Sequence, residues 1–440
     1  MMIDAVTSTL ASYLLYFKAL VKSSGVFRQA PNQIPAAEKH LLLITWAFPP
    51  VVSGGVYRPL SFVRAAAMNG WKVTVICGPG PAKTDAAGQY LAQQIPANVS
   101  IHRIALPERR PSHNWFPRVD GGLLNALSIA NIAVPATRGK TIVMASGPPF
   151  CSFVGGWLLS RRLGAPLVLD YRDEWTQCPF EFVTATGHDR TWEKRCLRAA
   201  ATVLVTTQSF THQIEESFPF VPEEKIKLIP NGYEPSDFAT DEVDSVPSSK
   251  AQDSLLTISY LGYLAEHIDP DEFINTFEQA LELEPSLQAR LRLRFVGKRN
   301  PIVEDKFRAS RMAELIQFTD QVSKQDAARI MRESSAVLLF NPPRLSRYLP
   351  GKLFDYVASG ASLLVYGSGG EVQKAIARSS TGEVVTAGDP QALAQALVRL
   401  LATEDSSHNP DRQKWLHAHE RGRIAETMLA HLETILDQKG

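Results

Sequence analysis

Long apolar runs that do not alternate with polar residues recur along the chain, and helical patterns separate them. The first run is HLLLITWAF at 40–48, which PPVVSGG interrupts. A helical pattern then covers 57–68 and ends before Asn69 and Gly70, a pair that suits a helix C-cap. The next apolar run is WKVTVICG at 71–78. Because unalternating runs are typical of strands buried on both faces, this order predicts a βαβ unit of a parallel sheet.

The same pattern continues through both halves of the chain. Further apolar runs of the first half are KTIVMAS, APLVLDY, ATVLVTT and KIKLIPN. Residues 232–254 are polar, rich in serine, aspartate and proline, and show no periodicity, which favours a linker. The second half has apolar runs at 255–262, 291–297, 315–320, 335–341, 361–367 and 382–388, and helical patterns at 271–283, 324–333, 350–358, 371–378 and 390–402.

Two sets of βα units joined by a polar linker predict an α/β fold. We expect two doubly wound, Rossmann-like domains that face each other across a cleft, with ligands at the carboxyl ends of the strands. The expected organisation is a helical extension at 1–38, an N-terminal domain at 39–235, a linker at 236–254, a C-terminal domain at 255–405 and a helical segment at 406–440.

Composition adds limits on location and partners. The 440 residues are 45% hydrophobic and 21% charged with a net charge of +1, which is typical of a soluble protein and gives no reason to expect nucleic acid. The four cysteines form no CxxC pair, so we expect a reducing cytoplasm and no disulfides.

The first residues do not read as a signal peptide, because an acid comes before any base and Lys18 interrupts the apolar run. Leu10, Leu14, Phe17 and Val21 follow helical spacing. Two interpretations stay open: an interfacial helix at the inner face of the cytoplasmic membrane, or a helix packed on its own domain or frayed.

The strongest candidate for chemistry is LPGKLFDYVASG at 349–360, which reads as a short helix with Pro350 at its start. A helix N-terminus carries free N–H groups and partial positive charge, and Lys352 adds a full charge. Gly351 lets a ligand approach the backbone. Asp355 lies on the same face one turn deeper, where its carboxylate can accept bonds from a ribose. Together these residues indicate a nucleotide site. The alternative is a surface ion pair.

Two Gly-Gly pairs precede predicted helices and offer the same close backbone approach. Gly54 and Gly55 follow the first strand, with Arg58 one turn into the helix. Gly370 ends the second pair, before Glu371. An ordinary tight turn and a helix-dipole role for the glutamate are the alternatives.

A charged cluster, LVLDYRDEW at 167–175, stands at the end of another predicted strand. Asp170, Arg172, Asp173 and Trp175 would therefore lie at the cleft edge, where buried charges mark a candidate site. A structural Asp–Arg pair is an equally good reading of Asp170. Another acidic motif, DPD at 269–271, opens a helix, so capping is preferred to metal binding there.

The ordered set of motifs resembles the retaining GT-B glycosyltransferases of family 4, group 1 type, over about 40–405. The motifs that carry the resemblance are TWAFPPVVSGGVYRP, GWKVTVI, SGPPF, LDYRDEWT, LIPNGYEPSDF, ISYLGYL, RFVG, IQFTDQVSKQDAARIM, LPGKLFDYVASG, GGEVQKAI and GDPQALAQAL.

The resemblance implies a nucleotide-sugar donor, UDP- or GDP-linked, and no further cofactor or metal ion. The donor diphosphate would lie beside Gly351 and Lys352, with Asp355 on the ribose and Gly54 and Gly55 approaching the diphosphate. Relatives have their last helices crossing back to the N-terminal domain. Candidate residues are assigned as catalytic (Lys352, Arg58 and Asp173), donor-binding (Gly54, Gly55, His267, Arg347, Gly351, Lys352, Asp355, Gly370 and Glu371) and acceptor-side (Arg172 and Trp175).

The chain departs from the family pattern at two places. Arg347 stands where the family has the first glutamate of its E-x7-E motif, and Asp355 stands at the second. The basic pair after the first strand of the second domain is replaced by Tyr263 and Ile268, for which His267, Lys298 and Arg347 are candidate substitutes.

The sequence therefore predicts a transferase that moves a sugar, with retention, onto a glycan or lipid-linked acceptor in envelope or exopolysaccharide assembly. The loops at 107–118 and 176–190 are candidates for acceptor selection. The alternatives are a non-catalytic binding or partner protein of the same fold, favoured by Arg347, and a nucleotide-sugar epimerase.

Overall fold

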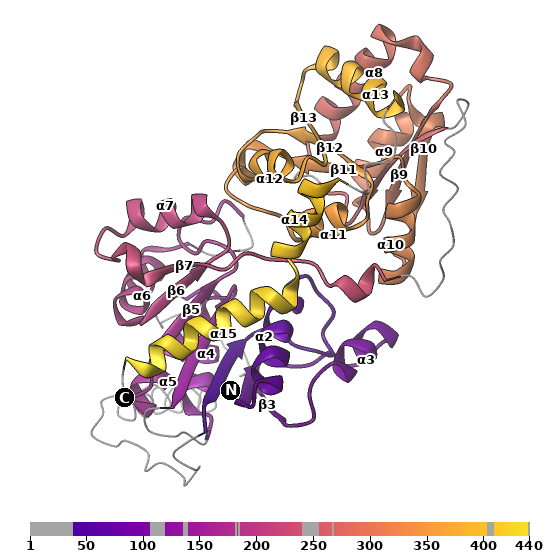
Figure 1. Cartoon of the computed structure of the whole chain (residues 1–440). Helices are drawn as coiled ribbons and strands as arrows, with labels where there is room; N and C mark the ends of the chain where they lie inside the picture. The colour runs from indigo at the N-terminus through magenta and orange to yellow at the C-terminus, as the bar shows by residue number, and fades with distance from the viewer. Residues whose placement is uncertain are drawn as a thin grey trace, which may run out of the picture. The chain divides into compact units, whose positions relative to one another are not determined.

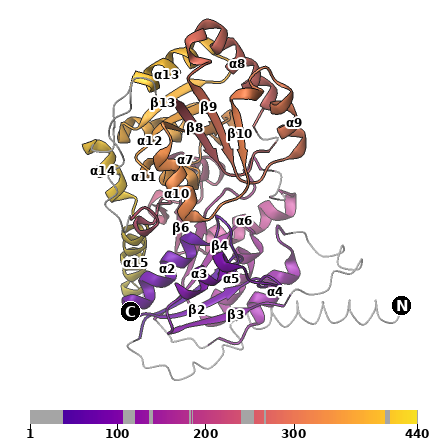
Figure 2. The same ribbon diagram turned by 90° about the vertical axis from the view of Figure 1, so that its right-hand side faces the viewer.

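The computed structural model describes residues 38–105, 119–134, 140–180, 183, 185–239, 255–265, 268–402 and 409–438. The chain forms two compact units. Unit 1 comprises Met1–Pro230 with Gly422–Gly440, and unit 2 comprises Asn231–Arg421. Figures 1 and 2 show that each unit is a twisted sheet with helices on both of its faces. The predicted N-terminal helix and the loop at 107–118 lie outside the described residues, as do His267 and most of the linker.

Unit 1 contains a seven-stranded sheet in the order β3-β2-β1-β4-β5-β6-β7, and every described pairing is parallel. The central strands are fully buried, as their apolar runs predict. The strands are β1 (His40–Thr45), β2 (Lys72–Cys77), β3 (Val99–Arg103), β4 (Thr141–Gly147), β5 (Leu167–Tyr171), β6 (Thr202–Val205) and β7 (Ile226–Leu228).

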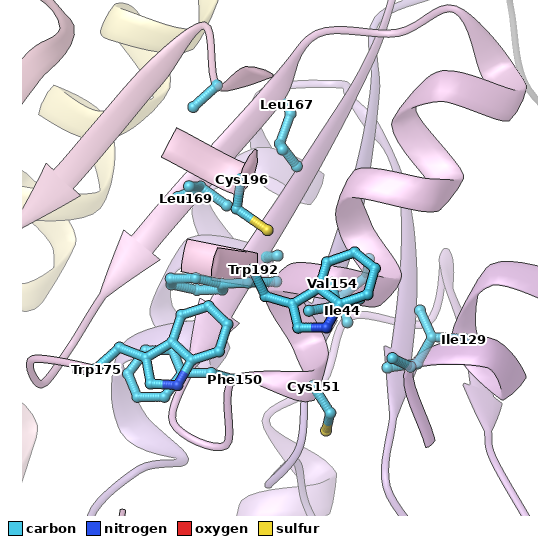
Figure 3. Close-up of a cluster of buried hydrophobic side chains, with 14 of the residues drawn as sticks. Ile44, Ile129, Phe150, Cys151, Val154, Leu167, Leu169, Trp175, Trp192 and Cys196 are labelled. Atoms are coloured by element: carbon cyan, nitrogen blue, oxygen red, sulfur yellow. The ribbon is translucent and has the colours of Figure 1, made fainter. Parts of the chain in front are cut away.

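Helices cover both faces of this sheet and form two apolar cores. Helices α4, α5 and α6 pack over one face, where Phe150, Trp175, Trp192 and Cys196 lie together (Figure 3). Helices α2 and α15 pack over the other. The helices of unit 1 are α2 (Tyr57–Met68), α3 (Ala86–Gln93), α4 (Leu123–Asn131), α5 (Cys151–Leu163), α6 (Gly187–Ala199), α7 (Gln208–Ser217) and α15 (Arg421–Asp437).

Unit 2 repeats the architecture with six strands in the order β10-β9-β8-β11-β12-β13. The strands are β8 (Leu256–Leu261), β9 (Leu291–Val296), β10 (Ile316–Thr319), β11 (Ala336–Asn341), β12 (Ser362–Gly367) and β13 (Gly382–Thr386). The helices are α8 (Pro270–Leu283), α9 (Pro301–Ala309), α10 (Lys324–Glu333), α11 (Gly351–Ala358), α12 (Glu371–Ser379), α13 (Pro390–Ala402) and α14 (Pro410–Ala418). The connections β8–α8 and β11–α11 leave on either side of the point where the strand order reverses, the usual ligand position in such sheets.

The boundaries of the two units differ from the expected domain limits. Tyr233 belongs to unit 2, because its side chain is 8% exposed within the core of that unit and its N–H donates to the carbonyl of His419 at 3.1 Å. Trp415 on α14 packs in the same core. The final helical stretch is therefore two helices. The first belongs to unit 2, and the chain returns to unit 1 from Gly422 onward.

Strand β3 and helix α9 are among the elements that were not predicted. Strand β3 has polar and partly exposed residues at the edge of the sheet, so it carries no long apolar run. Helix α9 is short and charged, with only Val303 and Phe307 buried. Asp269 caps α8 by accepting the N–H of Glu272 at 3.1 Å. Among the described residues, no helix is both long and apolar enough to cross a bilayer.

Candidate functional site

The ends of two neighbouring strands in unit 2 approach each other too closely for side chains. Gly262 follows β8 and Gly297 follows β9, with φ of +140° and +125°. A Cβ on Gly297 would lie 2.4 Å from the carbonyl oxygen of Gly262. Only glycine adopts this backbone without strain, so both turns keep the strand ends bare.

A pocket of about 320 Å³ opens beside these two turns, at the carboxyl ends of β8, β9 and β10. Its walls combine aliphatic side chains with the polar ends of Lys298 and Gln321. A largely apolar pocket with a few polar groups is the usual form of a small-molecule site. The lining residues are Leu261, Gly262, Tyr263, Val296, Gly297, Lys298, Gln321, Val322 and Ala327.

Lys352 brings a cation to the same edge of the sheet. Its Nζ donates to the hydroxyl of Tyr260 at 3.0 Å and lies 4.2 Å from the centroid of that ring. A Cβ on Gly262 would be only 2.9 Å from this Nζ, so the ammonium group lies directly against the glycine turn. Lys352 therefore does not form the alternative ion pair with Asp355, because its ammonium group is directed toward Tyr260.

Burial lowers the pKa of Lys352 to about 8, and in the described part of the chain no carboxylate counteracts this effect. The lysine is still mostly charged at neutral pH, but desolvation makes that charge costly until an anion approaches. Tyr356, one turn further along α11, fixes the helix to the strand: its hydroxyl accepts the N–H of Leu261 at 2.9 Å. The arrangement is suited to binding an anion.

The N-terminus of α11 lies beside this lysine. Pro350 is the N-cap residue and makes no side-chain cap bond, so the first N–H groups receive no partner from its side chain. Gly351 is exposed, and a Cβ added to it would meet nothing within 4 Å. There is therefore open space at the helix end where a phosphate could approach the backbone.

Asp355 lies on α11 one turn after Lys352, as the spacing predicts. Its Oδ1 is buried and makes no hydrogen bond to a described residue. Burial raises the pKa of this carboxyl, while the charges of Lys324 and Arg421 oppose the rise and Asp237 adds to it. A buried carboxylate oxygen that lacks a donor is costly, and a ribose hydroxyl is one group that would satisfy it.

The loop that carries Arg347 is tied to the start of α12. The N–H of Glu371 donates to the carbonyl of Ser346 at 2.8 Å. Gly370 has φ of +79°, and a Cβ there would lie 2.2 Å from the same carbonyl oxygen. Glu371 is 7% exposed and accepts from Lys374 at 3.0 Å. The structure thus brings Arg347, Gly370 and Glu371 into one region of unit 2.

In unit 1, Arg172 fixes the loops that follow β1 and β4. Its guanidinium donates to the carbonyls of Gly55 at 2.8 Å and Gly147 at 3.2 Å, and also to Pro148. A Cβ on Gly55 would lie 2.3 Å from Arg172 Nη1, whereas Gly54 has nothing within 4 Å. Arg172, expected on the acceptor side, therefore binds backbone carbonyls of these loops. Position 55 has to be glycine because a side chain there would clash with the guanidinium of Arg172.

Arg58, predicted to be catalytic, takes part in a buried network of hydrogen bonds. It is 6% exposed and pairs with the fully buried Asp170, with Nη2 to Oδ1 at 2.8 Å and Nε to Oδ1 at 3.0 Å. Ser146 donates to the other carboxylate oxygen at 2.7 Å, and Arg58 also reaches the carbonyl of Pro230 at 2.7 Å. The network joins α2, β4, β5 and the last residue before unit 2.

Trp175 also differs from its expected role. The side chain is 0% exposed and stacks on Phe150 with centroids 4.9 Å apart (Figure 3). Its indole N–H donates to Asp189 at 3.3 Å. Packing explains this residue, since a buried ring offers no surface to an acceptor. Asp173 is partly exposed, and burial raises the pKa of its carboxyl while Arg172 opposes the rise.

Sequence reasoning missed Tyr260 and the two glycine turns as parts of the site. The signal was present, because LLTISYLG and LRLRFVG both end in a glycine directly after a buried strand. From the sequence, Tyr260 was interpreted only as an apolar residue of a strand. Its contact with Lys352 spans more than ninety residues of sequence, so no local pattern reveals it.

Two family models match the chain in succession. Residues 53–232 match a glycosyl transferase 4-like domain, and residues 256–403 match the glycosyl transferases group 1 domain. Together these matches cover most of both units. A search of curated proteins finds no relative.

Solved structures with this fold include several glycosyltransferases. Anabaena HepE in complex with UDP and glucose matches with a TM-score of 0.60 and 14% identity over 89% of this chain and 99% of its own. Sucrose-phosphate synthase from Thermosynechococcus elongatus matches with a TM-score of 0.63 and 16% identity over 91% and 100%. A UDP-forming trehalose-phosphate synthase from Burkholderia vietnamiensis matches with a TM-score of 0.63 and 15% identity over 90% and 100%. At these identities the likeness establishes the fold.

The Arg58–Asp170 pair gives a first testable prediction. Asp170→Ala leaves the buried guanidinium of Arg58 without its carboxylate partner, so the free energy of unfolding of unit 1 should fall by about 3–5 kcal/mol. Denaturant unfolding followed by tryptophan fluorescence measures it, since six of the seven tryptophans precede residue 231. Asp173→Ala is the matched control and should cost less than about 1 kcal/mol. Equal losses in the two variants would contradict the structural role.

Proposed function

The chain belongs to the GT-B glycosyltransferases of family 4, group 1 type, and from that premise we propose that it transfers a sugar from a nucleotide diphosphate to a glycan or lipid-linked acceptor. The transfer retains the anomeric configuration, needs no metal ion and serves envelope or exopolysaccharide assembly in the cytoplasm. One observation carries the proposal: the Nζ of Lys352 lies against a side-chain-free glycine turn, next to a pocket and a helix N-terminus.

Each part of this region suits one part of a nucleotide. The aliphatic walls formed by Val296, Val322 and Ala327 suit a planar base. The buried Oδ1 of Asp355 suits a ribose hydroxyl. Lys352 and the N–H groups at the start of α11 suit the diphosphate. The four features lie within unit 2, so this unit is the proposed donor-binding unit.

In the proposed chemistry the bond between the anomeric carbon and the diphosphate oxygen breaks, a bond from that carbon to an acceptor hydroxyl oxygen forms, and the hydroxyl proton passes to the leaving diphosphate. Negative charge grows on the phosphate oxygen as the glycosidic bond breaks. A lysine that is already desolvated and held by Tyr260 stabilises this charge without further reorganisation, which is the most effective form of electrostatic catalysis. Side chains and the helix N-terminus would therefore carry the role that a metal ion has in other phosphate chemistry.

UDP is the first nucleotide to test. Structures of Anabaena HepE hold UDP and UDP-glucose, and the trehalose-phosphate synthase is described as UDP-forming. These are statements about those proteins, and they support a UDP-linked donor for this chain, with a GDP-linked donor as the second choice.

One observation favours a second function. Arg347 takes the position of a glutamate that relatives use toward the donor sugar, and it shares its loop with Ser346, to which Glu371 is bonded. A cation there would bind phosphate but not accept sugar hydroxyls. A protein that binds a nucleotide sugar without turning it over is the resulting alternative.

A donor panel distinguishes the two. UDP-, GDP- and ADP-sugars are incubated with the full chain, and release of the nucleotide diphosphate is measured together with binding by calorimetry. We expect binding and slow hydrolysis of one nucleotide class. Binding without hydrolysis, even with added acceptors, would support the binding protein, and absence of binding to every donor would refute both.

Lys352→Met tests the proposed diphosphate contact. UDP affinity should fall by about 10- to 100-fold, since a hydrogen bond to a charged group contributes about 1.5–3 kcal/mol. Stability should stay equal or rise, because the variant no longer buries a charge. Calorimetric titration and thermal unfolding measure the two effects. Lys414→Met, at an exposed position on α14, is the control and should bind UDP normally. Normal UDP binding by Lys352→Met would refute the phosphate role.

A further inference from the structure

The outer face of α6 carries positive charge without compensation on the same helix. Its two acids point inward: Asp189 is fully buried and accepts from Trp175 and the backbone of Asp120, and Glu193 is 1% exposed and accepts from Thr176. The bases of the helix are at least partly exposed, and they are His188, Arg190, Lys194, Arg195 and Arg198. Burial of both carboxylates thus leaves a helix whose solvent-facing charges are all basic.

Two rows of aromatic rings underlie these arginines. In the first, Trp157 of α5 contacts Trp192 of α6 with centroids 5.8 Å apart. The guanidinium of Arg161 lies over the ring of Trp157 at 5.4 Å from its centroid, and that of Arg195 lies over Trp192 at 4.9 Å. Trp192 itself is directed into the core, toward Val154 (Figure 3). An arginine therefore lies over each ring of a tryptophan pair in which Trp192 is buried and Trp157 is partly exposed.

The second row has the same construction with phenylalanines. Phe218 and Phe220 lie 6.0 Å apart, with Arg190 over Phe218 at 5.0 Å and Arg198 over Phe220 at 4.4 Å. Phe220 is 38% exposed. Stacking on the aromatic rings restricts the motion of the guanidinium groups, so little side-chain entropy is lost when they bind an anion. We call the two rows together with Lys194 the arginine–aromatic face.

The whole chain, with these five bases included, has a net charge of only +1, so the residues outside the face are on balance acidic. The segment that follows Phe220 balances itself, with Glu223 and Glu224 against Lys225 and Lys227. The excess therefore belongs to α6 and the end of α5. A local basic cluster on a chain whose net charge is close to zero indicates a surface that meets an extended anionic partner.

We propose that the arginine–aromatic face docks on an anionic lipid bilayer. Guanidinium groups backed by tryptophan and phenylalanine suit the headgroup region, where a polar tip meets phosphate and an apolar body lies below it. Exposed Phe220 can enter the interface beside Arg198. Each base near an anionic membrane contributes about 1 kcal/mol, so four or five give a reversible attachment. The proposal concerns a surface of unit 1 and does not rest on the donor site.

Nucleic acid is a poorer match for the same charges. Proteins that bind single strands offer free aromatic faces on which bases stack. Here the arginines cover the rings, and Trp192 and Phe218 are also buried. The face can therefore contact phosphates but offers few rings to bases, which favours a headgroup surface.

Vesicle co-sedimentation of the full chain tests the proposal. The vesicles contain one part phosphatidylglycerol to two parts phosphatidylcholine, or phosphatidylcholine alone. The wild-type chain should bind the anionic vesicles and not the neutral ones. Arg195→Glu/Arg198→Glu should lose at least about tenfold in partitioning, since each charge contributes roughly fivefold. Arg195→Lys/Arg198→Lys keeps the charge and should retain most of the binding, which separates a charge effect from a folding defect.

The matched control is Lys83→Glu/Lys414→Glu, which makes the same change in net charge at two exposed lysines elsewhere. It should bind vesicles as the wild type does. Any contribution of residues 1–37 is common to all variants and cancels in the comparison. Undiminished binding by Arg195→Glu/Arg198→Glu, an equal loss in the control, or tighter binding to a duplex DNA than to the vesicles would overturn the proposal.

Discussion

The organising constraint of the candidate site is the close approach of two strand ends that carry no side chains. Gly262 and Gly297 adopt backbone conformations that other residues rarely reach, and the carbonyl of one occupies the space that a Cβ of the other would need. This bare edge is what Lys352 lies against and what the pocket opens beside. A side chain at either glycine would fill the space in which the proposed diphosphate has to fit.

Three cations that are wholly or partly buried, Arg58, Arg172 and Lys352, fall into two kinds according to the groups around them. Arg58 and Arg172 are surrounded by acceptors, a carboxylate in one case and backbone carbonyls in the other. The hydrogen bonds of these two arginines hold loops and strands in place, so both residues have a role in stabilising the fold. Within the described residues, Lys352 has only Tyr260 as a partner, through its hydroxyl and its ring, and the lowered pKa of the lysine reflects the cost of that position. A cation kept in a costly position without a resident anion is better explained by a ligand than by the fold.

The fold was largely accessible from sequence, because apolar runs and helical periods are local. Both sheets and the helices at 57–68, 324–333 and 390–402 follow directly from these patterns. Edge strand β3 and charged helix α9 were missed since neither buries enough apolar surface to leave a pattern. Only part of the candidate site could be predicted from the sequence. Lys352 and Asp355 share a local motif, but the partner of Lys352 and the inward packing of Trp175 depend on contacts between distant segments.

The central claim is that Lys352 is a desolvated cation that binds the diphosphate of the donor. The most direct measurement is the pH titration of its side chain by NMR with isotope-labelled lysine, assigned by its loss in a Lys352 variant. The free protein should give a pKa of about 8. Added UDP should raise that pKa, because an adjacent anion favours the charged form. A pKa near the ordinary value of about 10.4 that UDP does not change would contradict the account.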